Sequence, residues 1–385
     1  MASEDYIARA QALAPLIREH ADYAERERRL AAPVAEAFAR EGLYRVAAPE
    51  ACHGAEADPM TQIAVIEAVS RADGSAGWNL MIGIETFGLI GPGFLETCPE
   101  LIEDPMVVMA SSTAAVGKAE RVDGAWRVNG QWQFVSGIHN AQLFGATVQL
   151  FDDGELISQG PKYAVVPLGE YEILDTWHVG GLRGSGSHDV RLDNVVVPNE
   201  RIIAPIGGNT SESPQLRFPL SSRLAYNKVA VGLGIARAAI DAFVDLATRK
   251  KPRFTTRTLR DRPFAQRALA KAEARIHGAR AATFELVEQM WEKVCAFDEV
   301  TIEERALFQI ICSDAAQASA EVVDMLAEAA GTSANQLGHP LERLGRDARV
   351  IRQHVTVAPH HIEDGGRVLL GLEPESNMLA TVKSR

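Results

Sequence analysis

Paired cysteines, an excess of basic residues and long apolar runs are all missing from this sequence, and each absence excludes a class of protein. The net charge of −12 argues against nucleic acid as a partner, because nucleic-acid binding depends on clustered Lys and Arg. No apolar run approaches membrane-spanning length, and the acidic start of the chain is unlike a signal peptide. The four cysteines form no CxxC pair, which favours free thiols of a reducing compartment: Cys52, Cys98, Cys295 and Cys312. We therefore expect a cytoplasmic protein that binds small molecules and no membrane.

Several familiar site motifs are absent as well. The sequence DGSAG at residues 73–77 starts with Asp and follows a helical pattern, so it does not indicate the nucleophile elbow of a serine hydrolase. Gly232 and Gly234 lie inside a helical pattern without a preceding strand, which favours close helix packing over dinucleotide binding. The residues His354, His360, His361 and Glu363 do not have the spacing of a standard metal site, and we expect no metal.

The pattern of apolar residues predicts an α+β protein in three parts. Residues 1–105 show helical spacing, with a helix start at Asp58-Pro59. Residues 106–215 contain short β-rich runs separated by Asp-Gly turns at 123–124 and 153–154, and a polar stretch from Gly207 to Pro219 ends this region. Residues 216–385 return to long amphipathic helices. This order excludes a doubly wound fold, in which strands and helices alternate throughout.

The run NGQWQFVSG at residues 129–137 carries the first candidate site residues. A hydroxyl at a strand edge, such as that of Ser136, can hydrogen-bond the polar edge of a flavin ring, while an aromatic residue such as Phe134 packs against its apolar part. Gly137 directly follows Ser136 in the sequence. Taken alone, the run is more typical of an aromatic-rich hairpin core.

Two further segments follow along the chain. In the first, WHVGGLRGSGSHDV at residues 177–190, glycines permit close backbone approach, and Ser185 and Ser187 offer hydroxyls to a ring or a phosphate. A plain glycine-rich turn is the alternative interpretation. The second is the helical segment PLERLGRDAR at residues 340–349, which follows Ala330-Gly331-Thr332.

Together these three segments resemble the acyl-CoA dehydrogenases, and the resemblance covers almost the whole chain. It implies an N-terminal helical domain, a central β-barrel domain, a C-terminal four-helix bundle and a homotetramer. It also implies that Phe134, Ser136 and Gly137 contact a flavin ring, that Ser185 and Ser187 contact the ring or a phosphate, and that Thr332 lies near the cofactor.

The base that an acyl-CoA dehydrogenase needs is missing at its usual positions. Such an enzyme removes an α-proton with a carboxylate while hydride passes to the flavin. Alignment on Arg346-Asp347 puts Val355 at the position of the common Glu, and no acidic residue stands between Glu212 and Asp241, where the other branch has its base.

The chain is instead similar to the two-component flavin monooxygenases of the same superfamily. The matching features are ADGSAGW at residues 72–78, Trp177 ahead of the glycine-rich turn, and His354. The resemblance implies reduced FMN, with FAD possible, which a separate reductase supplies and which reacts with oxygen to form a hydroperoxide. It implies that Ser136 is catalytic and holds the flavin ring or its peroxide, that Trp177 packs beside the ring, and that His354, an imidazole titrating near neutrality, is the acid or base. Arg249 matches the arginine that reaches a neighbouring subunit's flavin phosphate, with Arg253 and Arg257 as alternatives.

The expected function is therefore insertion of one oxygen atom into a small aromatic or heteroaromatic substrate of the phenol or indole type. An FAD-dependent acyl-CoA dehydrogenase is the first alternative, and a flavin-binding protein without turnover is the second. A dehydrogenase would purify with tightly bound FAD, and an oxygenase would bind reduced FMN and consume oxygen.

Overall fold

The computed structural model describes residues 3–158, 160–204, 212–376 and 378–379. These residues divide into two compact units, the first within Met1–Val65, Trp78–Val179 and Arg183–Arg217, the second within Ile66–Gly77, Gly180–Leu182 and Phe218–Arg385. Met1 and residues 207–211 of the predicted polar stretch lie outside the described residues. The three-domain division, with boundaries after residues 105 and 215, stays a prediction.

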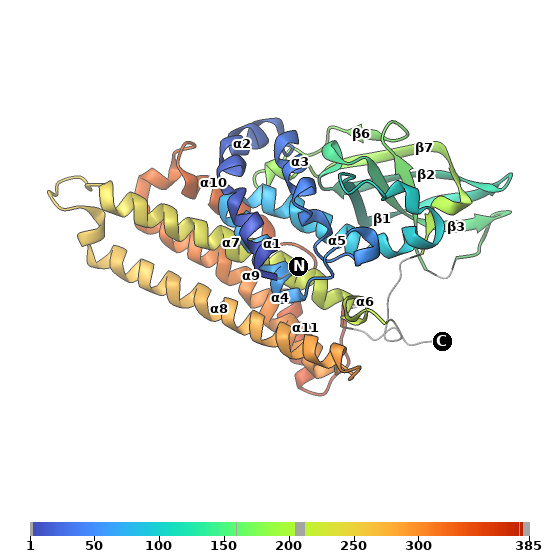
Figure 1. Ribbon diagram of the computed structural model, residues 1–385. Helices are drawn as coiled ribbons and strands as arrows, with labels where there is room; N and C mark the ends of the chain where they lie inside the picture. Colours follow the sequence, from blue (N-terminus) through green and yellow to red (C-terminus); the bar gives the residue numbers. More distant parts are fainter. Residues whose placement is uncertain (1–2, 159, 205–211, 377, 380–385) are drawn as a thin grey trace. The chain divides into compact units, whose positions relative to one another are not determined.

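The N-terminal part of the chain is helical, as its apolar spacing predicts (Figure 1). The predicted helix start at Asp58-Pro59 is confirmed, because the Asp58 carboxylate accepts the backbone N–H of Thr61 at 2.9 Å, which satisfies a donor at the helix end. The helices are α1 (Ser3–Ala12), α2 (Ala14–Glu27), α3 (Ala32–Arg40), α4 (Pro59–Ala72) and α5 (Gly74–Thr97), and a short α6 (Pro214–Arg217) ends the first unit.

The rest of the first unit is one mixed sheet of eight strands. The predicted turns Asp123-Gly124 and Asp153-Gly154 each close a two-residue hairpin, and all four residues have positive φ, which suits this turn chemistry. Strands β1 and β3 pair in parallel, and the other pairs are antiparallel. The strands are β1 (Met109–Val122), β2 (Ala125–Val135), β3 (Leu143–Asp152), β4 (Glu155–Leu156), β5 (Lys162–Pro167), β6 (Glu172–Leu174), β7 (His188–Pro198) and β8 (Ile202–Ile203).

The strand order shows an open sheet, so the predicted closed barrel is not confirmed. The order is β6-β7-β2-β1-β3-β5-β8, with β4 paired to β3, and among the described residues β6 and β8 are not paired with each other. The two end strands have only three and two residues, too few to form the continuous ladder that closes a barrel.

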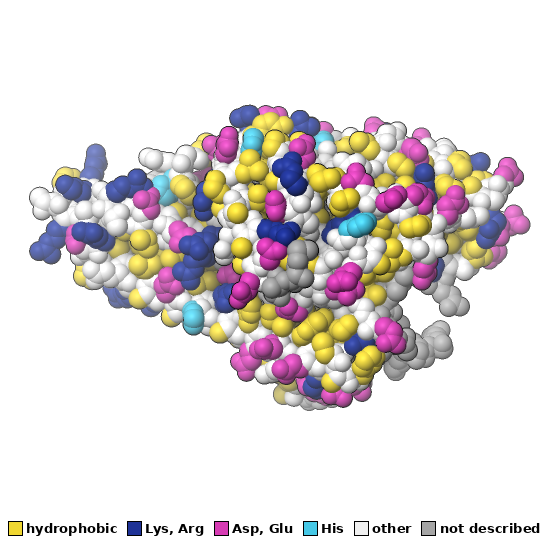
Figure 2. Space-filling view, viewed as in Figure 1, with side chains coloured by type: hydrophobic (Ala, Val, Ile, Leu, Met, Phe, Trp, Pro, Cys, Tyr) yellow, Lys and Arg dark blue, Asp and Glu magenta, His cyan; other side chains and the backbone are white. Residues whose placement is uncertain are grey.

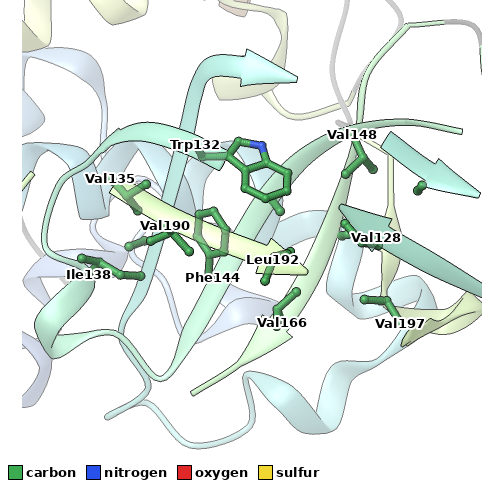
Figure 3. Close-up of a cluster of buried hydrophobic side chains, with 14 of the residues drawn as sticks. Val128, Trp132, Val135, Ile138, Phe144, Val148, Val166, Val190, Leu192 and Val197 are labelled. Carbon is green, nitrogen blue, oxygen red and sulfur yellow. The ribbon is translucent and has the colours of Figure 1, made fainter. Parts of the chain in front are cut away.

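Apolar side chains of the sheet form one hydrophobic core within the first unit (Figure 3). Trp132 is at its centre: its ring meets Phe144 edge to face at 5.6 Å, and its Nε1 donates to the carbonyl of Thr147 at 2.9 Å. A Cβ atom at Gly117 would lie 2.3 Å from the Trp132 ring, so only glycine fits there. The predicted aromatic hairpin core therefore exists, and Trp132 rather than Phe134 fills it.

The second unit is built from helices. Three are long, and α9 packs against both of the others and against the two shorter helices. This arrangement confirms a helical C-terminal region without confirming the predicted four-helix bundle. Thr301 and Glu304 cap the start of α9 reciprocally. The helices are α7 (Leu220–Arg249), α8 (Pro263–Cys295), α9 (Ile302–Ala330), α10 (Pro340–Ile351) and α11 (His360–Leu369).

Close packing explains the two glycines in α7, as the sequence predicts. A Cβ atom at Gly232 would lie 2.9 Å from the Oγ of Ser319 on α9, and one at Gly234 would lie 2.5 Å from the carbonyl oxygen of Glu67. Neither glycine therefore serves dinucleotide binding. Within the part of the chain that the structure describes, no helix is both long and apolar enough to cross a membrane.

Candidate functional site

A chain of buried hydroxyls connects two of the sequence motifs in the first unit. The Trp78 Nε1 donates to the Oγ of Ser136 at 3.0 Å, Ser136 hydrogen-bonds Ser187 at 2.7 Å, and Ser187 hydrogen-bonds Ser185 at 2.7 Å. All four side chains are buried. Because an indole N–H can only donate, the Ser136 oxygen accepts from Trp78 and keeps its own proton for another acceptor.

The backbone joins the same two motifs at Gly137. Its N–H donates to the carbonyl of Ser185 at 3.0 Å, and its φ of +79° lies in the left-handed region that favours glycine. The structure thus brings Ser136, Gly137, Ser185 and Ser187 together, as the resemblance implies for residues that hold a flavin. Their contact with a cofactor stays a prediction.

Phe134 and Trp177 form an aromatic pair beside these hydroxyls. Their rings meet edge to face, with centroids 6.2 Å apart, and the Phe134 side chain is 58% exposed. In a regular strand, Phe134 would lie on the same core-facing side as Trp132. However, the register of the β2–β7 pair shifts between Trp132 and Val135, and the backbone at Phe134 has a φ of +59°. This bulge turns the Phe134 ring out of the core and toward Trp177.

His188 fixes the backbone that carries Trp177. Its Nδ1 lies 3.3 Å from the backbone nitrogens of both Thr176 and Trp177, and its Nε2 lies 3.3 Å from the carbonyl of Arg28. The Nδ1 also lies 3.2 Å from the carbonyl of Leu174, so both ring nitrogens of His188 contact backbone polar groups. Burial lowers the pKa of His188, and burial followed by the charge of His188 lowers the pKa of His139 to about 4. Both rings are therefore neutral near pH 7.

His354 lies in the second unit, just after α10. Its Nδ1 is 2.9 Å from the Oγ1 of Thr356. Burial, followed by the positive charge of Lys228, lowers the pKa of His354 to about 3. The expectation that this imidazole titrates near neutrality is thus wrong in this structure, and the ring is neutral at physiological pH. A neutral imidazole can accept a proton, but it is not the imidazolium acid.

The remaining predicted residues, Arg249 and Thr332, lie at one end of the second unit. Arg249 is exposed and forms an ion pair with Asp245 one turn earlier in α7. The next residue, Lys250, donates to the carbonyl of Ala330, which brings the end of α7 to the short helix that contains Thr332. The connection from α7 to α8 is strongly basic, and Figure 2 shows Lys and Arg side chains gathered there. Most of these basic residues are exposed: Arg249, Lys250, Lys251, Arg253, Arg257, Arg260 and Arg262.

The histidines near the C-terminus pair with each other and with the backbone. The rings of His360 and His361 have centroids 4.1 Å apart, and the Nε2 of His361 lies 2.6 Å from the carbonyl of Val355. Among the residues that the structure describes, no group of three or more His, Cys, Asp or Glu is placed to hold a metal ion.

Two residues of the first unit that contact or adjoin the candidate site were not assigned roles from the sequence. Trp78 lies in the matched run at residues 72–78 and donates to Ser136, and its neighbour Asn79 accepts a hydrogen bond from Tyr44. A polar residue directly after a tryptophan in an otherwise apolar helix was the available signal for Asn79.

Comparison with known proteins gives matches along the whole chain. The acyl-CoA dehydrogenase N-terminal domain matches residues 8–91, and the acyl-CoA dehydrogenase C-terminal domain matches residues 227–359. The chain is 33% identical to an indole-3-acetate monooxygenase of Pseudomonas putida over 94% of each chain. It is 27% identical to the oxygenase component of an FADH(2)-dependent resorcinol hydroxylase of Rhizobium sp., over 96% of this chain and 95% of the other.

A solved structure has the same fold. The crystal structure of 3-HSA hydroxylase from Rhodococcus sp. RHA1 matches with a TM-score of 0.85 and 28% identity, covering 98% of this chain and 99% of the other.

Proposed function

The chain belongs to the acyl-CoA dehydrogenase family, among the oxygenase components of flavin-dependent monooxygenases, and from this premise we propose that it hydroxylates a small phenol-type or indole-type compound. Reduced flavin supplies the electrons that activate molecular oxygen, and a separate reductase delivers it. FMN is the proposed form, with FAD as the alternative, because one relative is named as FADH(2)-dependent.

The pairing of aromatic and hydroxyl side chains in the first unit carries this proposal. An isoalloxazine ring has an apolar part and a polar edge. Phe134 and Trp177 offer exposed and half-buried aromatic surface, and the buried hydroxyls of Ser136, Ser187 and Ser185 adjoin it. An aromatic surface beside buried hydroxyls suits a ring of mixed polarity.

His354 is the proposed group that accepts the substrate's proton. His354 is neutral at physiological pH, but its pKa of about 3 makes it a weak base in the free chain, so the resemblance carries this role; its Nδ1 lies 2.9 Å from the Oγ1 of Thr356. The same region disfavours a dehydrogenase, because the position of the usual catalytic Glu is Val355, whose side chain is apolar and 63% exposed.

The names of the relatives support the choice of substrate class. The indole-3-acetate monooxygenase and the resorcinol hydroxylase act, by their names, on an indole and a phenol. Assembly as a homotetramer is part of the proposal, with one of Arg249, Arg253 and Arg257 reaching the flavin phosphate of a neighbouring copy, since a guanidinium is a good partner for phosphate.

The test is an anaerobic titration of the purified full chain with reduced and with oxidised FMN and FAD. We expect reduced flavin to bind more tightly than oxidised flavin, and a hydroxylated product to form when air is admitted with an indole or phenol present. Copurification with tightly bound FAD, together with dye reduction by an acyl-CoA, would instead establish the dehydrogenase. Flavin binding with oxygen consumed only to hydrogen peroxide, and no hydroxylated product from any tested substrate, would favour the non-catalytic alternative.

A further inference from the structure

One buried donor beside the proposed flavin site has no partner among the residues that the structure describes. The side chain of Asn79, in α5, is 4% exposed, and its Nδ2 makes no hydrogen bond to any of them. A buried amide N–H without an acceptor costs about 1–3 kcal/mol, so its presence calls for an explanation.

The orientation of this amide is fixed by Tyr44. The Tyr44 hydroxyl donates to the Oδ1 of Asn79 at 2.9 Å, and in this orientation the NH₂ is the unpaired group. Burial raises the pKa of Tyr44, which keeps the hydroxyl protonated. Its ring meets Phe38 edge to face at 5.7 Å, and a Cβ atom at Gly83 would lie 2.2 Å from it, so Tyr44 has little room to move.

The free NH₂ lies against the strand end that carries Ser136 and Gly137. A Cβ atom at Gly137 would be 2.9 Å from the Nδ2 of Asn79, so the amide occupies the space next to this glycine. The acceptors at this strand end each already take one hydrogen bond from another donor. The Gly137 carbonyl accepts from Asn140, the Ser185 carbonyl accepts from Gly137, and the Ser136 oxygen accepts from Trp78.

We propose that Asn79 donates a hydrogen bond to an acceptor atom of the bound flavin ring, and that Tyr44 is the positioning residue that aims it. This inference rests on the proposed function. The ring's polar edge is rich in acceptor atoms, and reduction adds negative charge to it, so a fixed neutral donor favours the reduced ring over the oxidised one. Asn79 would thereby contribute to the preference for reduced flavin.

The test compares affinities for reduced and oxidised FMN, measured anaerobically by fluorescence on the full chain. Asn79→Asp keeps the acceptor that Tyr44 needs and replaces the donor by an oxygen. We expect it to weaken reduced FMN binding by about tenfold or more, the effect of losing a donor to a charged acceptor, and oxidised FMN binding by less. Tyr44→Phe should also weaken the binding of reduced FMN more than that of oxidised FMN, but by a smaller factor than Asn79→Asp does.

Thr97→Val is the matched control, because Thr97 lies in the last turn of the same helix and loses its hydrogen bonds to the carbonyl of Gly93 and to the Sγ of Cys98. It should change neither affinity. The inference is wrong if Asn79→Asp and Tyr44→Phe bind reduced FMN as the wild type does, if they weaken both redox states equally, or if only the substrate's KM changes. A wild-type chain that binds no reduced flavin would overturn the proposed function itself.

Discussion

Replacing His354 by Gln should make the protein less sensitive to acid. The pKa of His354 is lowered from 6.5 to about 3, mainly by burial and further by Lys228. Because the folded state resists protonation of this ring, stability is complete above the unfolded pKa and falls as the pH drops below 6.5 toward 3. Gln has a side chain of similar polarity that does not titrate in this range.

The magnitude follows from the two pKa values. Between about pH 7.5 and about pH 5, a group that titrates near 6.5 when unfolded and near 3 when folded removes about 2 kcal/mol of unfolding free energy. Urea unfolding at the two pH values measures this loss in the wild type and in His354→Gln. The other buried histidines contribute to both proteins, so the difference between the two losses isolates His354.

We expect the variant to lose about 2 kcal/mol less than the wild type over this interval. The same variant should bind reduced flavin as the wild type does, while product formation falls by about 10²–10⁴-fold, as for the loss of an acid or base group. An identical acid sensitivity in the two proteins would refute the buried, neutral state of His354, and unchanged turnover would remove it from the mechanism.

Five further substitutions test other predicted residues. Ser136→Ala leaves the Trp78 N–H without its acceptor, so it should lower the unfolding free energy by about 1–3 kcal/mol. It should also weaken the binding of reduced flavin, and a wild-type affinity in a flavin titration would contradict this. Gly137→Ala should cost about 1–2 kcal/mol from its positive φ alone, with more from contact with Asn79, and a melting temperature equal to that of the wild type would show that the turn is not constrained. One of the three variants Arg249→Ala, Arg253→Ala and Arg257→Ala should weaken FMN binding far more than riboflavin binding, because riboflavin lacks the phosphate. Equal losses of affinity for both ligands in all three variants would argue that the basic loop does not bind phosphate.

Local patterns predicted much of the architecture. The Asp-Gly turns, the helix start at Asp58-Pro59 and the packing role of Gly232 and Gly234 each depend on a few neighbouring residues, and the structure confirms them. The family was also identifiable, because its motifs occur in a fixed order along the chain.

Features that depend on distant contacts were not predictable in the same way. Whether the sheet closes depends on pairing between its end strands, which turn out to be very short. The outward turn of Phe134 arises from a bulge that the alternation of residues does not reveal. The low pKa of His354 comes from burial and from Lys228, which is 126 positions away in the sequence (354 minus 228). Only a folded structure brings such groups together.

The most direct test of the central claim is to trace the oxygen atom in the product. The full chain is loaded with anaerobically reduced FMN, mixed with oxygen gas labelled with the heavy isotope in ordinary water, and supplied with indole-3-acetate or a simple phenol. We predict a product that carries one labelled oxygen atom and forms only when flavin was reduced beforehand. Product without label, or labelled oxygen recovered only as hydrogen peroxide across the substrate panel, would contradict the assignment of this chain as a monooxygenase of these substrates.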